Sequence, residues 1–323
     1  MALFHTIDIS GKSFLVTGGA GFIGSHIVEY LTKHGAGKVR VLDNLSTGLR
    51  SNIDLFTSFP NYEFIEGDIR DADTCRRACE GIDHITHQAA LGSVPRSVKD
   101  PVTSNDVNIS GFVTMLTAAK DAGVKTFVYA SSSSVYGDEP NLPKREERTG
   151  NLLSPYAVTK MTNELYASVF GRLYGIKVAG LRYFNIFGPR QDPNGPYAAV
   201  IPLFVSGIIN RTPVYINGDG EQTRDFTYVE NAVQANVKAM LCDNDAAFGQ
   251  AYNIAVGDNF TVNFLFQQIR EQLGIDHAPI YREAREGDIR DSLADISKAR
   301  KLLGYEPTQH FLSGLSTTVD YFK

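Results

Sequence analysis

The stretch FLVTGGAGFIG, residues 14–24, predicts how the first part of this chain folds. A short apolar run leads into three glycines spaced G-x-x-G-x-x-G, and residues 23–35 continue with the apolar spacing of a helix. Strand, glycine-rich turn and helix in this order are typical of a dinucleotide-binding unit. Glycines allow a tight turn and a close approach of the backbone to a pyrophosphate, which would sit at the positive end of the helix.

An acidic residue follows at the distance that nucleotide recognition requires. Asp43 lies 19 residues after Gly24 and ends the β-branched run VRVLDN. A carboxylate there accepts hydrogen bonds from the adenosine ribose hydroxyls and repels a 2′-phosphate, which favours NAD over NADP. Side chains alternate along a strand, so Arg40 is predicted to face away from Asp43. Asp68, in GDIRD, is expected to end the next strand and to reach the adenine edge.

The first half of the chain alternates strand-like and helix-like segments. We expect parallel strands over residues 13–18, 39–44, 62–69, 84–89, 126–133 and 178–185, with helices over 23–35, 73–81, 108–123 and after 154. This alternation predicts an α/β fold, a doubly wound parallel (Rossmann) sheet with a smaller mixed C-terminal substrate lobe. We assign the larger domain to residues 1–182 plus about 226–257, and the lobe to 183–225 and 258–323.

Composition narrows the class of protein. The 323 residues carry a net charge of −5, so no basic footprint supports nucleic-acid binding. No apolar run approaches the ~20 residues of a membrane span, and the N-terminus lacks the pattern of a signal peptide. Three cysteines suit a reducing compartment, so we expect a cytoplasmic protein. Cys75 and Cys79 have no histidine at ligand spacing, so we predict packing roles and no metal site.

Tyr156 and Lys160, in SPYAVTK, are one helical turn apart and share a helix face. A free tyrosine has a pKa near ~10, and a neighbouring positive charge lowers it. The pair therefore suits a general base that takes a proton from a hydroxyl group. Taken alone, the same spacing also arises by chance on surface helices.

Several motifs together resemble a known family. VTGGAGFIGSH, GDIRD, YASSSSVYGD and SPYAVTK look like the extended short-chain dehydrogenase/reductases. LRYFNIFGPRQDPNGPYAAVIP, INGDGEQTRDFTYVEN and REGDIRDSLADISKA narrow the resemblance to the nucleotide-sugar 4-epimerases, over nearly the whole chain. HQAALGSVPRS resembles the bacterial subgroup that acts on UDP-N-acetylhexosamines in polysaccharide biosynthesis.

The resemblance implies a tightly held NAD and a catalytic trio of Ser132, Tyr156 and Lys160. Tyr156 would take the proton of the sugar 4-hydroxyl while C4 gives hydride to the nicotinamide, and Ser132 would bond the same oxygen. Lys160 would hold the nicotinamide ribose and help to lower the pKa of Tyr156. The implied cofactor-binding residues are Gly18, Gly21, Phe22, Ile23, Gly24, Asp43, Asn44, Ser46, Gly48, Asp68, Ile69, Gln88, Ala89, Ala90, Tyr156, Lys160 and Tyr183.

The run of serines leaves one alternative open. Residues 131–134 are all serine, and neighbours on a strand cannot all face the cofactor. The register against residues 135–137 favours Ser132, with Ser133 as the alternative. Sugar-nucleotide 4,6-dehydratases carry an Asp-Glu pair directly after the catalytic hydroxyl, whereas this chain has Ser133 and Ser134. Serines cannot supply that acid and base, so the sequence argues against dehydration.

Substrate contacts also come from the resemblance. Arg224 and Arg285 would clamp the pyrophosphate, since guanidinium binds phosphate in a bidentate manner. Tyr215 and Asn217 align with the uracil and ribose subsite, and Asp288 aligns with a ribose contact. The implied substrate-binding residues are Gly92, Ser93, Ser132, Ser133, Asn185, Ala199, Val200, Tyr215, Asn217, Arg224, Arg285, Asp288 and Ser292.

Two positions bear on the sugar. Ser292 stands where UDP-galactose epimerases have tyrosine, and Gly92 or Ser93 stands where their bacterial type has lysine. Both changes enlarge the pocket and favour UDP-GlcNAc and UDP-GalNAc over the UDP-glucose pair. A methylene-scale mismatch is worth only ~1–3 kcal/mol, so we expect weaker activity on plain hexoses, and the uronic acids stay open.

Other readings remain open from sequence alone. A UDP-glucose or UDP-glucuronate 4-epimerase and a net oxidoreductase of the same family are the enzyme alternatives. A catalytically dead nucleotide sensor is the alternative from another class, but such proteins typically lose the Tyr-Lys pair. Apolar residues on the helices at 108–123 and after 154, together with the resemblance, predict a homodimer. His26, His84 and His87 are expected in core or surface roles.

Overall fold

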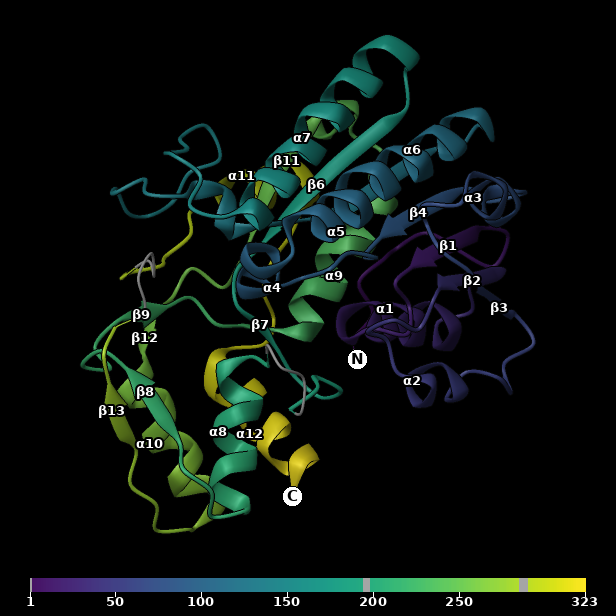
Figure 1. The fold of residues 1–323 in the computed structure, drawn as a ribbon. Helices are drawn as coiled ribbons and strands as arrows, with labels where there is room; N and C mark the ends of the chain where they lie inside the picture. The colour runs from purple at the N-terminus through teal and green to yellow at the C-terminus, as the bar shows by residue number, and fades with distance from the viewer. Residues whose placement is uncertain (1, 194–197, 285–289) are drawn as a thin grey trace.

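The computed structural model describes residues 2–193, 198–284 and 290–323 and is organised around a seven-stranded sheet (Figure 1). The strand order is β11-β6-β5-β4-β1-β2-β3, and every neighbouring pair is parallel. The strands are β1 (Ser13–Thr17), β2 (Lys38–Asp43), β3 (Tyr62–Glu66), β4 (His84–His87), β5 (Thr126–Ser132), β6 (Lys177–Tyr183) and β11 (Gln250–Ile254). All six expected strands are present, so the predicted doubly wound parallel sheet is confirmed.

Helices cover both faces of this sheet. Because side chains alternate, Val16 of β1 faces one layer and Leu15 faces the other. The Val16 layer contains α1 (Phe22–Lys33), α9 (Val229–Met240) and α11 (Ser297–Leu303). The Leu15 layer contains α3 (Ala72–Cys79), α6 (Phe112–Asp121) and α7 (Pro155–Tyr174). Both layers therefore have apolar cores that fix the sheet from either side.

The expected helix over 108–123 is in fact two elements. A π-helical segment, η1 (Asp106–Gly111), precedes α6. Two short helices, α4 (Val94–Lys99) and α5 (Pro101–Asn105), come before it and were not expected. Their start signals are nevertheless visible, because Ser93 and Asp100 cap them and each has proline in its first turn. The remaining short helices of this domain are α2 (Arg50–Asp54), η2 (Ser133–Tyr136) and η3 (Asp245–Ala247).

The smaller lobe has a core of its own, built on Phe204, Leu265 and Phe311. Its helices are α8 (Val200–Ile209), α10 (Val262–Leu273) and α12 (Phe311–Phe322). Its short strands are β7 (Ile186–Phe187), β8 (Tyr215–Asn217), β9 (Thr223–Arg224), β10 (Thr227–Tyr228), β12 (Phe260–Thr261) and β13 (Ile280–Arg282). Figure 1 shows this lobe below the carboxyl ends of the sheet. The domain bounds stay a prediction, although α11 packs in the sheet's core rather than here.

Buried polar groups of the larger domain take up the positions that alternation predicts. Arg40 donates to the carbonyl oxygens of Arg77, Ala78 and Glu80 at the end of α3, away from Asp43. Cys75 and Cys79 lie on the buried side of α3, where burial raises the pKa of both thiols to about 12. Among the described residues, no helix has the length and apolar character needed to cross a membrane.

Candidate active site

A cavity of about 740 Å³ opens at the carboxyl edge of the sheet. Strand β1 pairs with β2 on one side and β4 on the other, so the chain direction switches sides there. Loops leaving such a point diverge and leave a crevice, which is where open α/β sheets bind ligands. The lining includes the glycine turn, the ends of β2, β4, β5 and β6, and the start of α7.

The glycine turn fits a pyrophosphate. Gly18 has φ +69, and a Cβ added there would lie 2.6 Å from the backbone nitrogen of Ala89. A Cβ on Gly24 would overlap the carbonyl oxygen of Gly18. Helix α1 begins after Gly21 with no side-chain cap and no acidic residue in its first turn. Its first amide groups therefore remain available to an anion at the positive end of the helix.

The acid after β2 is held in place by the turn itself. Asp43 accepts hydrogen bonds from the amides of Ala20 (2.9 Å) and Leu45 (2.8 Å) and lines the cavity. Burial raises the pKa of this carboxyl, and the two amides oppose that rise. Each carboxylate oxygen keeps a free lone pair, so Asp43 can still accept from a ribose hydroxyl.

Asp68 differs from the expectation in one respect. Strand β3 ends at Glu66, so Asp68 lies in the loop beyond it. Arg70 binds its carboxylate in a bidentate manner at 3.0 and 2.8 Å, which together with Asn44 holds its pKa near 2. Asp68 therefore lines the cavity as the partner of Arg70 rather than as a free carboxylate.

The cavity gathers all seventeen expected cofactor residues, from Gly18 to Tyr183. Their roles stay predictions, but their convergence from separate elements is a property of the fold. The sequence did not single out the other lining residues, most of which have apolar or small side chains with little chemical signal. These are Leu42, Thr47, Gly67, Arg70, Leu91, Thr103, Val107, Ala130, Ser131, Ile186 and Gln191.

The three expected catalytic side chains meet at one end of this cavity. Ser132 is the last residue of β5, whereas Tyr156 and Lys160 lie in the first turns of α7. The ammonium of Lys160 donates to the carbonyl oxygen of Ala130 at 2.8 Å and lies 5.8 Å from the centre of the Tyr156 ring. The helix thus presents a phenol and an ammonium side by side to the strand end.

The pKa values of this pair correct one expectation. Burial raises the pKa of Tyr156, and a hydrogen-bonding interaction with Ser132 only partly offsets the rise. Lys160 is only 3% exposed, and burial lowers its pKa to about 8. Desolvation disfavours the charged form of both groups, so the protein's own residues do not bring the phenol towards neutral pH.

The serine register follows the alternation of β5. The hydroxyl of Ser131 donates to Glu164 at 2.5 Å, below α7. Ser132 faces the opposite way, lines the cavity and accepts from the amide of Ser134 at 3.1 Å. Ser133 also lines the cavity, so the alternative of Ser133 is still open on position alone.

A buried ion pair holds α7 on the sheet. Arg182 of β6 donates to both oxygens of Glu164 at 2.9 and 2.8 Å, and the two side chains are 6% and 11% exposed. Ser131 of β5 completes the same carboxylate. Glu164 is one turn beyond Lys160 on the helix, so this contact sets the position of Tyr156 and Lys160 against Ser132.

Comparison with known proteins agrees with this geometry. The family model described as "NAD dependent epimerase/dehydratase family" matches residues 14–255. The chain is 37% identical over 311 residues to the UDP-glucose 4-epimerase of Mycolicibacterium smegmatis, covering 96% of this chain and 98% of that protein. The chain belongs to the NAD-dependent epimerase/dehydratase family.

Solved structures of family members superpose closely on this one. A UDP-N-acetylglucosamine 4-epimerase from Methanobrevibacter ruminantium, in complex with UDP-N-acetylmuramic acid, gives a TM-score of 0.91 at 42% identity over 96% of this chain and 98% of its own. The UDP-glucose 4-epimerase of Thermus thermophilus, in complex with NAD, gives 0.84 at 36% identity over the same shares. NAD is therefore the cofactor of this enzyme family, and the cradle at Gly18 and Asp43 fits it.

The expected substrate residues are more dispersed than the NAD-binding ones. Gly92, Ser132, Ser133 and Asn185 line the cavity. Asn185 has φ +38 and donates to the carbonyl oxygen of Asp225 at 3.2 Å. Among the described residues, the following expected positions lie outside the cavity lining: Ser93, Ala199, Val200, Tyr215, Asn217, Arg224 and Ser292. Arg285 and Asp288 lie outside the described residues.

Contacts within the lobe show what surrounds these outer positions. Arg282 of β13, which the sequence did not single out, lies over the ring of Tyr215 at 5.0 Å and donates to the Asn217 side chain at 2.5 Å. Arg224 donates to the carbonyl oxygens of Thr223 and Arg290. Arginine at a strand edge carries no local signal for stacking, so only the β8–β13 pairing reveals this contact.

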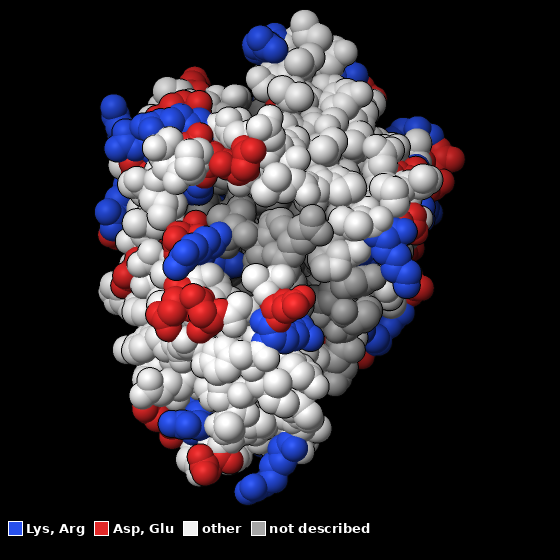
Figure 2. Space-filling view, turned by 60° about the vertical axis from the view of Figure 1, so that its left-hand side comes forward, with Lys and Arg blue, Asp and Glu red and all other residues white. Residues whose placement is uncertain are grey.

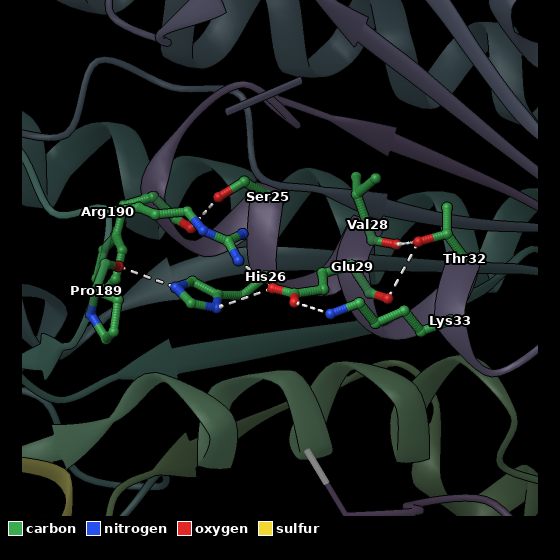
Figure 3. A network of polar contacts seen from close by, with 9 residues as sticks. Ser25, His26, Val28, Glu29, Thr32, Lys33, Pro189 and Arg190 are labelled. Atoms are coloured by element: carbon green, nitrogen blue, oxygen red, sulfur yellow. Dashed lines mark hydrogen bonds and ion pairs between the residues drawn. The ribbon is translucent and has the colours of Figure 1, made fainter. Parts of the chain in front are cut away.

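The loop after β7 is attached to the larger domain through α1. In Figure 3, His26 points to Pro189, and Glu29 lies between His26, Lys33 and Arg190. His26 donates to the carbonyl oxygen of Pro189 at 2.9 Å, and burial lowers the pKa of His26 to about 4. A neutral imidazole therefore secures the loop that brings Gln191 to the cavity. His26, His84 and His87 are all buried, so of the core or surface positions expected for them the structure shows core ones.

The lowered pKa of Lys160 can be measured directly. In NAD-free protein labelled with ¹³C-lysine, one side-chain resonance should titrate near pH 8, because burial removes water from the ammonium. Exposed lysines should titrate near ~10.4. The folded pKa lies below the ordinary 10.5, so this group's contribution to stability should increase as pH rises between about 8 and 10.5.

The resonance that disappears in Lys160→Met identifies the residue. A Lys160 resonance that titrates with the exposed lysines would contradict the assignment of a desolvated ammonium.

Proposed function

We propose that this protein interconverts UDP-GlcNAc and UDP-GalNAc by reversible epimerisation at C4. The observation that carries the proposal is the cluster of Ser132, Tyr156 and Lys160 at one end of a cavity that fits NAD. A phenol, a hydroxyl and an ammonium around one point can handle a single proton on a sugar oxygen. The two positions after Ser132 are serines, so this chain lacks the acid and base that dehydration needs there.

Each of the three groups has a definable task. NAD, when bound, supplies the acceptor and donor for the hydride at C4. Tyr156 accepts the proton of the 4-hydroxyl and returns it after the sugar has presented its other face. Ser132 donates to the same oxygen and stabilises it as it becomes a ketone. Lys160, held by the carbonyl of Ala130, keeps a positive charge beside the phenol while the pH stays below about 8.

Space near the cavity supports the acetylated sugars. A Cβ added to Gly92 would meet no atom within 4 Å, so this part of the lining is open. Ser292 is tied to β9 by its amide, which donates to Thr223 at 3.2 Å, and its side chain is small. The relative from Methanobrevibacter ruminantium is named for UDP-N-acetylglucosamine. The relative from Mycolicibacterium smegmatis is named for UDP-glucose, which makes the UDP-glucose pair the second candidate.

One assay tests the proposal. The purified protein is incubated with UDP-GlcNAc without added NAD, and UDP-GalNAc is followed by chromatography. We expect product, because the cofactor should stay bound through purification. Tyr156→Phe is the control: it should keep NAD yet lose turnover by ~10²–10⁴-fold, the usual contribution of a positioned acid–base group. The proposal is wrong if no UDP-GalNAc forms even after NAD is supplied.

The role of Ser292 has its own test. Ser292→Tyr should lower kcat/KM on UDP-GlcNAc by ~10–200-fold more than on UDP-glucose, because the ring fills volume that the acetyl group needs. Thr223→Val, on the neighbouring strand, controls for disturbance of β9. An equal loss on both sugars in Ser292→Tyr would remove the argument for this position.

We also propose that the enzyme acts as a homodimer through α7. Val158, Leu165, Val169 and Leu173 form one exposed stripe on this helix, with Leu165 and Leu173 61% and 68% exposed. Helical spacing places them on a common face, and a contiguous apolar surface of this kind is typical of a protein interface. In Figure 2 a broad uncharged area lies at the upper centre and right of the view, with basic and acidic side chains around its margins.

Charge on this stripe should separate the subunits. The double variant Leu165→Asp, Leu173→Asp should sediment as a monomer, because two carboxylates would be buried without partners. Leu312→Asp changes an exposed leucine on α12 and should leave the assembly as in the unaltered protein. A wild-type protein that is monomeric at micromolar concentration would refute the dimer.

A further inference from the structure

A closed ring of buried polar groups lies directly behind the cavity. Asn236 of α9 comes from the helix layer that lies on the sheet face opposite α7, and it is fully buried. Its amide meets the side chains of Gln88 and Tyr183, which both line the cavity. Thr86 of β4 completes the ring, and Asn236 itself is not part of the lining.

The orientation of every group in the ring follows from one backbone carbonyl. Asn236 Nδ2 donates to the carbonyl oxygen of Ala232 at 2.8 Å, and a carbonyl can only accept. The other hydrogen of Nδ2 therefore goes to the Tyr183 hydroxyl at 2.7 Å, and Oδ1 faces Thr86 and Gln88. Since Tyr183 already accepts from Asn236, its own proton goes to Gln88 Oε1 at 3.2 Å.

The ring leaves no unused capacity on Asn236. Its two hydrogens go to Ala232 and Tyr183, and its oxygen accepts from Thr86 at 2.7 Å and from Gln88 at 3.1 Å. A fully satisfied buried network is rigid, whereas a partly satisfied one costs free energy. The side chains of Gln88 and Tyr183 are therefore held in one arrangement at the cavity floor.

The place of Tyr183 makes this arrangement relevant to chemistry. Tyr183 of β6 is paired in register with Ser132 of β5, so it lies beside the catalytic end of the cavity. Among the described residues, the cavity lining contains two phenols, Tyr156 and Tyr183. The ring engages the Tyr183 proton with Gln88. Burial raises the pKa of Tyr183, and the hydrogen bonds with Asn236 and Gln88 offset part of that rise. Of these two phenols, Tyr156 is the one whose proton the ring does not engage.

We propose that Asn236 is a positioning residue for the cofactor: through Gln88 and Tyr183 it fixes the cavity floor beside Ser132 and holds the Tyr183 proton on Gln88. Asn236 does so from the helix layer opposite α7, without being part of the cavity lining. The effect on turnover rests on the proposed function, whereas the effect on NAD binding does not. The two can therefore fail separately.

The test compares two buried asparagines of one helix. Asn236→Leu should release Gln88 and Tyr183, weaken NAD binding to stripped protein by ~10-fold and lower kcat by a similar factor with KM for the sugar nearly unchanged. Asn231 is equally buried on α9 but bonds Gln309 and Thr308. Asn231→Leu should lower the melting temperature comparably and leave NAD binding within about 2-fold.

A double-mutant cycle with Tyr183→Phe identifies the route. If Asn236 acts through the Tyr183 hydroxyl, Asn236→Leu should have little further effect on NAD binding in the Tyr183→Phe background. Asn236→Asp keeps the shape but loses the donor to Tyr183, so it should weaken NAD binding as well, and it serves if Asn236→Leu does not fold.

Two results would overturn the proposal. One is an NAD affinity of the Asn236 variants equal to that of Asn231→Leu. The other is full additivity of Asn236→Leu and Tyr183→Phe. If the Asn236 variants bind NAD more weakly as expected but the unaltered protein shows no epimerase activity, the result counts against the proposed function alone.

Discussion

The buried ion pair between Glu164 and Arg182 is the contact on which the site depends. Tyr156 and Lys160 lie on a helix and Ser132 lies on a strand, so they meet only if α7 keeps one position on the sheet. Glu164 binds Arg182 of β6 and Ser131 of β5 from that helix. Removing one partner of such a pair typically costs ~3–5 kcal/mol, because the other charge stays buried. Sliding of α7 would incur the same cost.

Burial then determines the acid–base character of the cavity. The packing of α7 on the sheet, which places Tyr156 and Lys160 beside the end of β5, also removes water from both side chains. As a result the phenol is harder to ionise and the ammonium is easier to neutralise than in solution. The spacing of the pair in sequence predicts attraction between phenolate and ammonium but not this shared cost of desolvation. The ionisation of Tyr156 and Lys160 therefore depends on the groups they contact, which are Ser132, the Ala130 carbonyl and, when it is bound, the cofactor.

The larger domain can be predicted well from sequence, because its strands and its glycine turn are each specified by neighbouring residues. Each β-branched run became a parallel strand, and Gly18 and Gly24 stand where a Cβ would collide with backbone. The seventh strand, β11, was not predicted as such, since QAYNI is short and is stabilised by pairing with β6 about 70 residues away. Helices α8 and α10 were likewise not predicted, because their apolar faces are stabilised by packing on the lobe core around Phe311.

The α/β fold and the cofactor class follow from local sequence alone, and local sequence also nominates Tyr156 and Lys160 as the pair for proton transfer. Those properties depend on alternation, on glycine geometry and on the chemistry of side chains at fixed spacing. The polar residues that support these features become apparent only once the chain is folded. Glu164, Arg182 and Asn236 resemble ordinary surface residues in sequence, and they acquire their roles when distant elements bury them. In the water-poor interior each buried polar group must find a partner, and those partners are set by packing rather than by sequence neighbours.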